Sequence, residues 1–281
     1  MEHFSLFNQS IAKIGIGTWG IGGKREADTS RDAESIEAIR TGIEHGLNHI
    51  DTAEVYGAGH AEELVGEAIA PYKRDRLFLT TKVSGDNLSY RAVHAAARAS
   101  LERLNTEYID LYLIHWPNPT IPIEQTMRAL TELTGSGLVR MLGVSNFSPE
   151  EMTAAQAAIP YRLIANQIEY NLLVREHGRQ SERISSQIIP YCRENGMLVI
   201  AYSPLAKGLL AKPGIAALDT IAAKHAKTPA QVALNWIISQ HGIITIPRTA
   251  SKAHMLENIG ALRWHLPEED IAYLTENVAH D

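Results

Sequence analysis

The sequence predicts one domain, residues 1–281, folded as a (β/α)8 TIM barrel with an N-terminal β-hairpin and an extra C-terminal helix. Eight short apolar segments alternate with segments of helical periodicity along the chain. Such alternation is typical of right-handed βαβ units that build a parallel sheet. Eight units in 281 residues favour a closed barrel over an open doubly wound sheet. No linker or low-complexity segment divides the sequence.

The composition is ordinary for a globular protein, with 45% hydrophobic and 21% charged residues. The net charge of −6, without blocks of like charge, argues against nucleic-acid binding. Cys192 is the single cysteine, which excludes an internal disulfide and fits a reducing compartment. The N-terminus lacks the features of a secretory signal, and no run of 18 apolar residues occurs. We therefore expect a cytoplasmic protein without a membrane span.

The predicted strands are short apolar segments, and some are apolar almost throughout, as expected for strands buried on both faces. Before the barrel, two short segments of alternating polar and apolar residues flank residues 8–10 and predict a β-hairpin within residues 1–14. The eight barrel strands are predicted at residues 14–17, 47–51, 76–82, 109–115, 139–145, 163–169, 197–202 and 243–246.

The helices between these strands are predicted from their periodicity and their end signals. Ser148, followed by Pro149 and two acidic residues, marks one helix start, and Thr228 before Pro229 marks another. The predicted helices cover residues 33–44, 62–70, 90–103, 123–133, the segment after 148, 181–194, 230–240, 251–261 and the segment after Pro267.

A glycine pattern near the N-terminus raises a second fold class. Gly15, Gly17 and Gly20 satisfy G-x-G-x-x-G, the fingerprint of a dinucleotide-binding Rossmann fold. That fingerprint requires the last glycine to open a helix, whereas the next helix is predicted to start only at Thr29 or Ser30. We therefore reject the Rossmann interpretation.

Four reactive residues stand at the ends of neighbouring predicted strands. Asp51 ends the second strand and Tyr56 follows it, Lys82 ends the third strand, and His115 ends the fourth. Each could have a structural role, as a helix cap, a packing aromatic, a surface charge or a buried histidine. In this barrel, however, active sites are built at the carboxyl ends of the strands, so the four residues predict one catalytic site.

These residues suggest a proton donor directed at a carbonyl group. A tyrosine hydroxyl, with a reference pKa of about 10, is a poor acid near neutrality, but a nearby ammonium such as Lys82 lowers that pKa. Asp51 would keep a buried Lys82 charged, and His115 would orient a substrate oxygen. The sequence contains no evident nucleophile and no cluster with the spacing of metal ligands. A proton donor alone cannot complete the reaction, so a second reactant is needed. We expect this reactant to be a nicotinamide cofactor that supplies a hydride.

The sequence resembles the aldo-keto reductase family over almost its whole length. The matching motifs are GTW at 17–19, DTAEVYG at 51–57, LTTK at 79–82, SLERL at 100–104, DLYLIHWP at 110–117, GVSNF at 143–147, NQIEY at 166–170 and AYSPL at 201–205. The resemblance implies a (β/α)8 barrel and NAD(P)H-dependent reduction of aldehydes and ketones. It also implies the catalytic residues Asp51, Tyr56, Lys82 and His115, with Tyr56 as the proton donor.

The resemblance further implies where the cofactor binds. Ser145, Asn146 and Gln167 would hydrogen-bond the nicotinamide carboxamide, and Tyr202 would stack on the ring, although Tyr202 could instead belong to the core. Residues 203–210 resemble the loop along the pyrophosphate. The complete implied set is Thr18, Trp19, Ser145, Asn146, Gln167, Tyr202, Ser203, Leu205, Lys207, Arg248, Thr249, Ser251, His254, Glu257 and Asn258.

The segment around Arg248 predicts a preference for NADPH over NADH, with NADH as a weaker alternative. Arg248 stands where relatives place a basic residue for the 2′-phosphate, and an arginine can bind a phosphate through two hydrogen bonds. The helix that follows offers free N–H groups and the positive end of its dipole. His254 replaces the second arginine of many relatives, so we expect a weaker preference than theirs.

The predicted substrate site contains Trp19, Tyr56, His115 and Trp116, with the two tryptophans as apolar walls or, alternatively, as structural packing. The segment after His115 is short, and only 17 residues follow Trp264. We therefore expect the long C-terminal substrate loop of many relatives to be absent, which would give an open pocket and broad specificity. A small carbonyl compound or alcohol is expected, but the sequence does not identify it.

Two other functions compete with carbonyl reduction. The first is a nicotinamide-binding regulatory module with little catalysis, which an intact set of catalytic residues disfavours. The second is a Schiff-base lyase on the same barrel with Lys82 as nucleophile, and a salt bridge to Asp51 would keep that lysine protonated and unreactive. The family resemblance makes a monomer the default oligomeric state.

Overall fold

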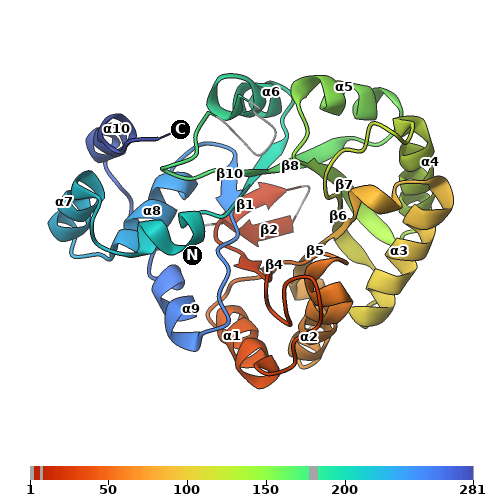
Figure 1. The fold of residues 1–281 in the computed structure, drawn as a ribbon, viewed down its shortest axis with the longest axis horizontal. Coiled ribbons are helices and arrows are strands. Elements are labelled where there is room, and N and C mark those ends of the chain that lie inside the picture. Colours follow the sequence, from red (N-terminus) through yellow and green to blue (C-terminus); the bar gives the residue numbers. More distant parts are fainter. Residues whose placement is uncertain (1–2, 7–8, 177–182, 281) are drawn as a thin grey trace.

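Eight parallel strands curl into a barrel inside a ring of helices, as predicted (Figure 1). The computed structural model describes residues 3–6, 9–176 and 183–280. The strands pair in the order of the chain from β3 to β10. They are β3 Ile16–Gly17, β4 His49–Asp51, β5 Phe78–Val83, β6 Ile109–Ile114, β7 Val139–Ser145, β8 Leu163–Glu169, β9 Leu198–Tyr202 and β10 Ile243–Thr245.

The barrel closes where the first strand meets the last. Ile14 forms a parallel bridge with Thr245, and the N–H of Gly15 donates to the carbonyl oxygen of Thr245 at 2.7 Å. A second parallel bridge joins Gly17, the last residue of β3, to Arg248, which follows β10. This closure brings the carboxyl ends of all eight strands to one rim.

Most residues of the strands are buried, as expected for a parallel sheet that is covered on both faces. Every residue of β5 and β6 is buried. In β6, Leu111 and Leu113 belong to the core inside the barrel, whereas Tyr112 and Ile114 pack in the core shared with the helices. The alternation of side chains along a strand thus fills both layers.

The helices surround the barrel, and most agree with the predicted segments. Capping boxes at Ser148 and Thr228 confirm the two predicted helix starts. The helices are α1 Asp32–Glu44, α2 His60–Ile69, α3 Tyr90–Arg103, α4 Ile123–Gly135, α5 Pro149–Ala157, α6 Ile189–Glu194, α7 Ala216–Lys224, α8 Pro229–Ile238, α9 Lys252–Ile259 and α10 Glu268–Asn277.

Two helical segments differ from the prediction. Helix α7 was not predicted, because Ile215 precedes it and its first turn therefore lacks a capping side chain. The helix predicted at 181–194 begins outside the described residues, and residues 184–188 form a π-helical turn instead of α-helix. Pro190, which has no N–H to donate, lies at the start of α6, so the regular hydrogen-bond ladder cannot run through it.

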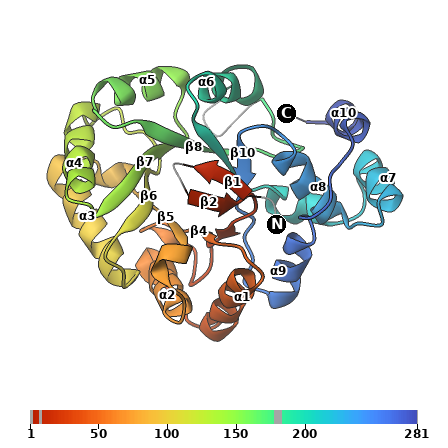
Figure 2. The ribbon, with the colours of Figure 1, turned by 180° about the vertical axis from the view of Figure 1, so that it is seen from behind.

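The predicted β-hairpin is present and covers the amino-terminal end of the barrel. Strand β1 (His3–Leu6) pairs antiparallel with β2 (Gln9–Ala12), and both lie over the centre of the ring in Figures 1 and 2. Residues 9 and 10, predicted in the turn, belong to β2, while residue 8 lies outside the described residues. Asn48, just before β4, accepts from Ala12 N–H at 2.8 Å and donates to Ser10 at 2.7 Å. The opposite rim therefore remains for the site.

The extra C-terminal helix, α10, docks through buried polar contacts. Arg175 donates to the carbonyl oxygens of Thr275 and Val278 at the end of this helix. Asp270 accepts hydrogen bonds from Lys224 at 2.8 Å and contacts the ring of His225 at 2.6 Å. Within the described ranges, no helix is both long enough and apolar enough to cross a membrane.

His60, at the start of α2, lies between two acids, and this arrangement is expected to make stability depend on pH. Nε2 of His60 lies 3.0 Å from Asp32 and Nδ1 lies 2.8 Å from Glu63, an arrangement that suits the doubly protonated ring. Burial opposes the charge, but the hydrogen bonds to Glu63 and Asp32 outweigh it and raise the pKa of His60. This stabilisation is therefore fully present below about pH 6.5, the reference pKa, and is lost as pH rises through the folded-state pKa.

We expect His60→Asn to be destabilised relative to the wild-type chain in mild acid and to approach it as pH rises. Urea unfolding of both proteins across a pH series measures the difference in unfolding free energy. A difference that stays constant with pH would show that the charge of His60 contributes nothing.

Candidate active site

The four predicted catalytic residues meet at the carboxyl rim of the barrel. Asp51 is the last residue of β4, Lys82 lies near the end of β5, and His115 follows β6. Tyr56 opens a short 3-10 turn, Tyr56–Gly59, between β4 and α2. All four are at most 9% exposed, so the rim holds a buried polar cluster.

Lys82 is the centre of this cluster. Its ammonium donates to Asp51 Oδ1 at 2.5 Å, to the carbonyl oxygen of Thr52 at 2.8 Å and to the Tyr56 hydroxyl at 3.2 Å. An ammonium has three donors, so these contacts use all of them. Burial alone would lower the pKa of Lys82, but Asp51 and Tyr56 outweigh it and raise that pKa. The structure thus holds a positive charge beside the tyrosine oxygen.

Two contacts in the cluster were not predicted. Gln167 Nε2 donates to Asp51 Oδ2 at 2.7 Å, so both oxygens of the carboxylate are engaged. The other is the carbonyl oxygen of Thr52, a backbone group that no residue pattern could reveal. Asp51 and Gln167 are 116 positions apart, and only the closed barrel brings them together.

The turn that carries Tyr56 depends on a glycine. Gly57 has φ of 55°, in the region where side chains are strained. A Cβ at this position would also lie 2.2 Å from the carbonyl oxygen of Gly22 in the preceding loop. Gly57 therefore allows the Tyr56 loop to pack directly on the loop after β3.

Aromatic rings pack against the ring of Tyr56. The ring of Trp19 lies 5.0 Å from that of Tyr56, and the ring of His115 lies 5.6 Å from it, both edge to face. Trp116 stacks at an angle on His115, with 4.7 Å between ring centres. Trp19 is 47% exposed, which favours a wall of an open pocket over a place in the core.

The residues predicted at the nicotinamide form a network continuous with the catalytic cluster. The hydroxyl of Tyr202 donates to Asn146 Oδ1 at 2.9 Å, and Asn146 Nδ2 contacts Ser145 Oγ at 3.0 Å and the carbonyl oxygen of His115 at 3.1 Å. Ser145 donates in turn to the carbonyl oxygen of Gln167 at 2.9 Å. Asn146 holds this position with φ of 60°, a conformation that asparagine tolerates better than most residues.

Other predicted cofactor residues lie on two loops of the same rim. The hydroxyl of Thr18 donates to the carbonyl oxygen of Asp51 at 2.9 Å, which ties the β3 loop to the cluster. After β9, Ser203 has φ of 51° and Lys207 has φ of 56°. Leu205 is half-buried beside them, whereas the side chain of Lys207 is exposed. These positive φ angles are rare outside glycine and bend the loop tightly.

The remaining predicted cofactor residues lie in the segment between β10 and α9 and on α9 itself. Arg248 is exposed, and its Nη2 lies 3.4 Å from the carbonyl oxygen of Gly20. Thr249 Oγ1 accepts the N–H of Ser251, the residue that precedes α9, at 2.9 Å. On α9, His254 is exposed, Glu257 is half-buried and Asn258 is buried.

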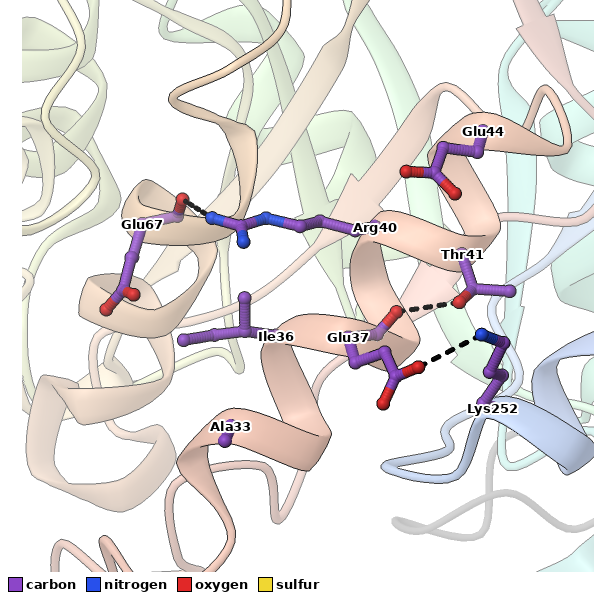
Figure 3. A pocket seen from close by; sticks show the side chains of 8 residues that line it. All are labelled: Ala33, Ile36, Glu37, Arg40, Thr41, Glu44, Glu67 and Lys252. Atoms are coloured by element: carbon purple, nitrogen blue, oxygen red, sulfur yellow. Dashed lines mark hydrogen bonds and ion pairs between the residues drawn. The ribbon is translucent and has the colours of Figure 1, made fainter.

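A polar groove elsewhere contains none of the predicted site residues. This groove, of about 450 Å³, lies on the helices outside the barrel. Figure 3 shows the ion pair of Glu37 with Lys252 there and Arg40 donating to the backbone of Glu67. It is lined by Ala33, Ile36, Glu37, Arg40, Thr41, Glu44, Glu67 and Lys252. We therefore place the candidate site at the strand ends.

Comparison with known proteins identifies the family. The family model described as Aldo/keto reductase family matches residues 13–279. The chain belongs to the aldo/keto reductase family. Among curated members of the family, methylglyoxal reductase YeaE of Escherichia coli (strain K12) is 37% identical, and the match covers 94% of this chain and 90% of that protein.

Solved structures of aldo-keto reductases share this fold. The thermostable aldo-keto reductase Tm1743 in complex with the inhibitor epalrestat superposes with a TM-score of 0.91 and 38% identity, over 98% of this chain and 99% of that one. An aldo/keto reductase from Klebsiella pneumoniae in complex with NADP and acetate gives a TM-score of 0.86 and 34% identity, over 98% and 94% of the two chains. Both the predicted family and the predicted barrel are confirmed.

Proposed function

We propose that this aldo/keto reductase family member reduces aldehydes and ketones to alcohols with NADPH, and that Tyr56 donates the proton. The observation that carries the proposal is the Lys82 ammonium, 3.2 Å from the Tyr56 hydroxyl and paired with Asp51. The methylglyoxal reductase and the NADP-bound structure among its relatives support the reaction and the cofactor.

The donor groups along the rim fit a phosphorylated nicotinamide dinucleotide. Ser145, Asn146 and Gln167 carry amide and hydroxyl groups suited to a carboxamide, while Arg248 presents a guanidinium suited to a phosphate. The first N–H groups of α9 have no partner within the helix and favour an anion. When bound, the nicotinamide would supply the hydride.

Each catalytic residue then has a role that its contacts support. Tyr56 would give its proton to the alkoxide oxygen of the reduced carbonyl, and the ammonium of Lys82 would stabilise the tyrosinate left behind. Asp51 holds Lys82 charged. His115, whose ring lies beside that of Tyr56, would orient the carbonyl oxygen, and Trp19 would limit the access of water.

The two competing functions fit the geometry less well. A Schiff-base lyase needs a neutral lysine nucleophile, but the ammonium of Lys82 is engaged by three acceptors and its pKa is raised, by Asp51 and Tyr56 against the effect of burial. A regulatory module has no need for a proton donor coupled to a buried charge pair. We therefore propose an alcohol-forming oxidoreductase of the NADP-dependent class, active as a monomer.

The direct test follows the absorbance of NADPH at saturating concentration with a panel of aldehydes, ketones and dicarbonyls. We expect turnover with several small carbonyls and slower turnover with NADH. Absence of turnover over the whole panel, from protein that binds NADPH, would favour the regulatory module. Trapping of a lysine adduct by borohydride would favour the lyase.

Arg248 is expected to read the 2′-phosphate of NADPH. Arg248→Ala should weaken NADPH binding by about 1.5–3 kcal/mol, the range for hydrogen bonds to charged groups, and NADH binding much less. Titration of both cofactors by fluorescence measures the two losses. Arg98→Ala, which removes an exposed arginine from α3, is the matched control. Equal losses for the two cofactors would show that Arg248 does not read the phosphate.

A further inference from the structure

Glu54 lies between Asp51 and Tyr56 in sequence but has no part in the proposed proton transfer. Its carboxylate is half-buried and points to the loop after β5. There Oε1 accepts the N–H of Ser84 at 2.6 Å and Nδ2 of Asn87 at 3.0 Å. Hydrogen bonds to an ionised acceptor are stronger than neutral ones, so Glu54 fastens the Tyr56 loop to the next loop of the rim.

The loop that Glu54 holds is packed tightly against Trp116. Ser84 begins the turn Gly85–Asn87 and accepts the N–H of Asp86 at 3.2 Å. A Cβ on Gly85 would lie 2.1 Å from Trp116 Nε1 and 2.8 Å from its carbonyl oxygen, so the glycine backbone lies against the indole. The loop that begins at Ser84 therefore packs directly against the Trp116 ring.

These contacts form a closed circuit of neighbours that begins and ends at Tyr56. From Tyr56 the circuit runs through Glu54 to the Ser84 loop, then to Trp116, and back through His115, whose ring lies 4.7 Å from Trp116 and 5.6 Å from Tyr56. Glu54 thus joins the loop that carries Tyr56 to the loop that packs against Trp116.

We propose that Glu54 is a positioning residue that sets the gap between Tyr56 and Trp116 and thereby selects carbonyl substrates by size. The inference rests on the proposed carbonyl reduction, because it assigns the substrate preference of that reaction to one contact. Removal of the carboxylate would leave the N–H of Ser84 without its acceptor. The loop that packs against Trp116 would then be held less firmly.

The kinetic test compares Glu54→Ala with Glu54→Gln on a small dicarbonyl and an aromatic aldehyde. In Glu54→Ala, kcat/KM should fall about tenfold more for the aromatic aldehyde, which meets the Trp116 ring, since small misplacements far from the chemistry are costly. Glu54→Gln should restore the wild-type ratio because its amide oxygen still accepts the Ser84 N–H. A general loss of stability would lower kcat/KM equally for both substrates, and that result would contradict the proposal.

A control and a second mutation sharpen this comparison. Glu67→Ala removes an exposed carboxylate from α2, which Figure 3 shows directed away from Arg40, and should leave the ratio unchanged. In a Trp116→Ala background, Glu54→Ala should no longer alter the ratio, because coupled residues are not additive. If Glu54→Ala changed the ratio of the two kcat/KM values just as much in the Trp116→Ala background, the proposal would be wrong.

A readout that does not depend on activity separates this proposal from the proposed function. The chain has 4 tryptophans, so protein labelled with 5-fluorotryptophan gives a simple fluorine NMR spectrum, in which Trp116→Phe assigns one resonance. That resonance should shift or broaden in Glu54→Ala and not in Glu54→Gln, while the other three report an intact fold. An unchanged Trp116 resonance in Glu54→Ala refutes the positioning role, whereas a wild-type chain that turns over no carbonyl refutes only the proposed reaction.

Discussion

Tyr56→Phe is expected to lower the turnover of carbonyl reduction by at least about a hundredfold, the low end of general acid catalysis. The change removes the hydroxyl that lies 3.2 Å from the Lys82 ammonium and leaves the ring between Trp19 and His115. Because the ring packing is retained, NADPH binding should stay nearly unchanged. Steady-state kinetics with an aldehyde and a fluorescence titration of NADPH measure the two quantities.

A matched control for this variant is Tyr161→Phe, which removes the hydroxyl of an exposed tyrosine. It should keep the wild-type rate. If Tyr56→Phe also reduced its substrate at near wild-type rate, another group would have to be the proton donor. A parallel loss of NADPH affinity would instead point to a disturbed binding site.

Lys82→Met is expected to destabilise the fold by about 3–5 kcal/mol, the range for removing one partner of a buried ion pair. Lys82 is fully buried, and its loss removes the ammonium paired with the buried Asp51 carboxylate, while Gln167 still donates to that carboxylate. Turnover should fall as well, because no ammonium remains beside Tyr56. Urea unfolding at neutral pH measures the loss of stability.

The pH dependence of this variant provides a further check. Burial raises the pKa of Asp51, and in Lys82→Met no ammonium opposes that effect. A group whose folded-state pKa is raised adds stability below its unfolded value, about 3.9 for aspartate, and this stability is lost as pH rises through the folded-state pKa. The loss of unfolding free energy in Lys82→Met, relative to the wild-type chain, should therefore shrink in acid. At neutral pH, the double variant with Asp51→Asn should recover part of that loss. If Lys82→Met lost less than about 1 kcal/mol of unfolding free energy at neutral pH, the interpretation of Lys82 and Asp51 as a buried ion pair would be wrong.

The fold class could be predicted from the sequence, because strand and helix periodicity are local properties that repeat eight times along this chain. The helix starts at Ser148 and Thr228 could be predicted as well, because the capping signal there lies within four residues. Where such a local signal is missing, as at the start of α7, the prediction failed. The π-helical turn before Pro190 likewise followed from a backbone restriction that periodicity does not capture.

For the site, the sequence placed Asp51, Lys82 and His115 at strand ends, and the barrel rule then predicted that they meet. Their catalytic roles stay predictions. Which atoms touch could not be predicted: Gln167 donates to Asp51 from 116 positions away, and Glu54 accepts a hydrogen bond from Ser84 on the next loop of the rim. The reason is that a hydrogen bond needs its two atoms within about 3 Å, and the register of eight strands, rather than any local pattern, sets that distance.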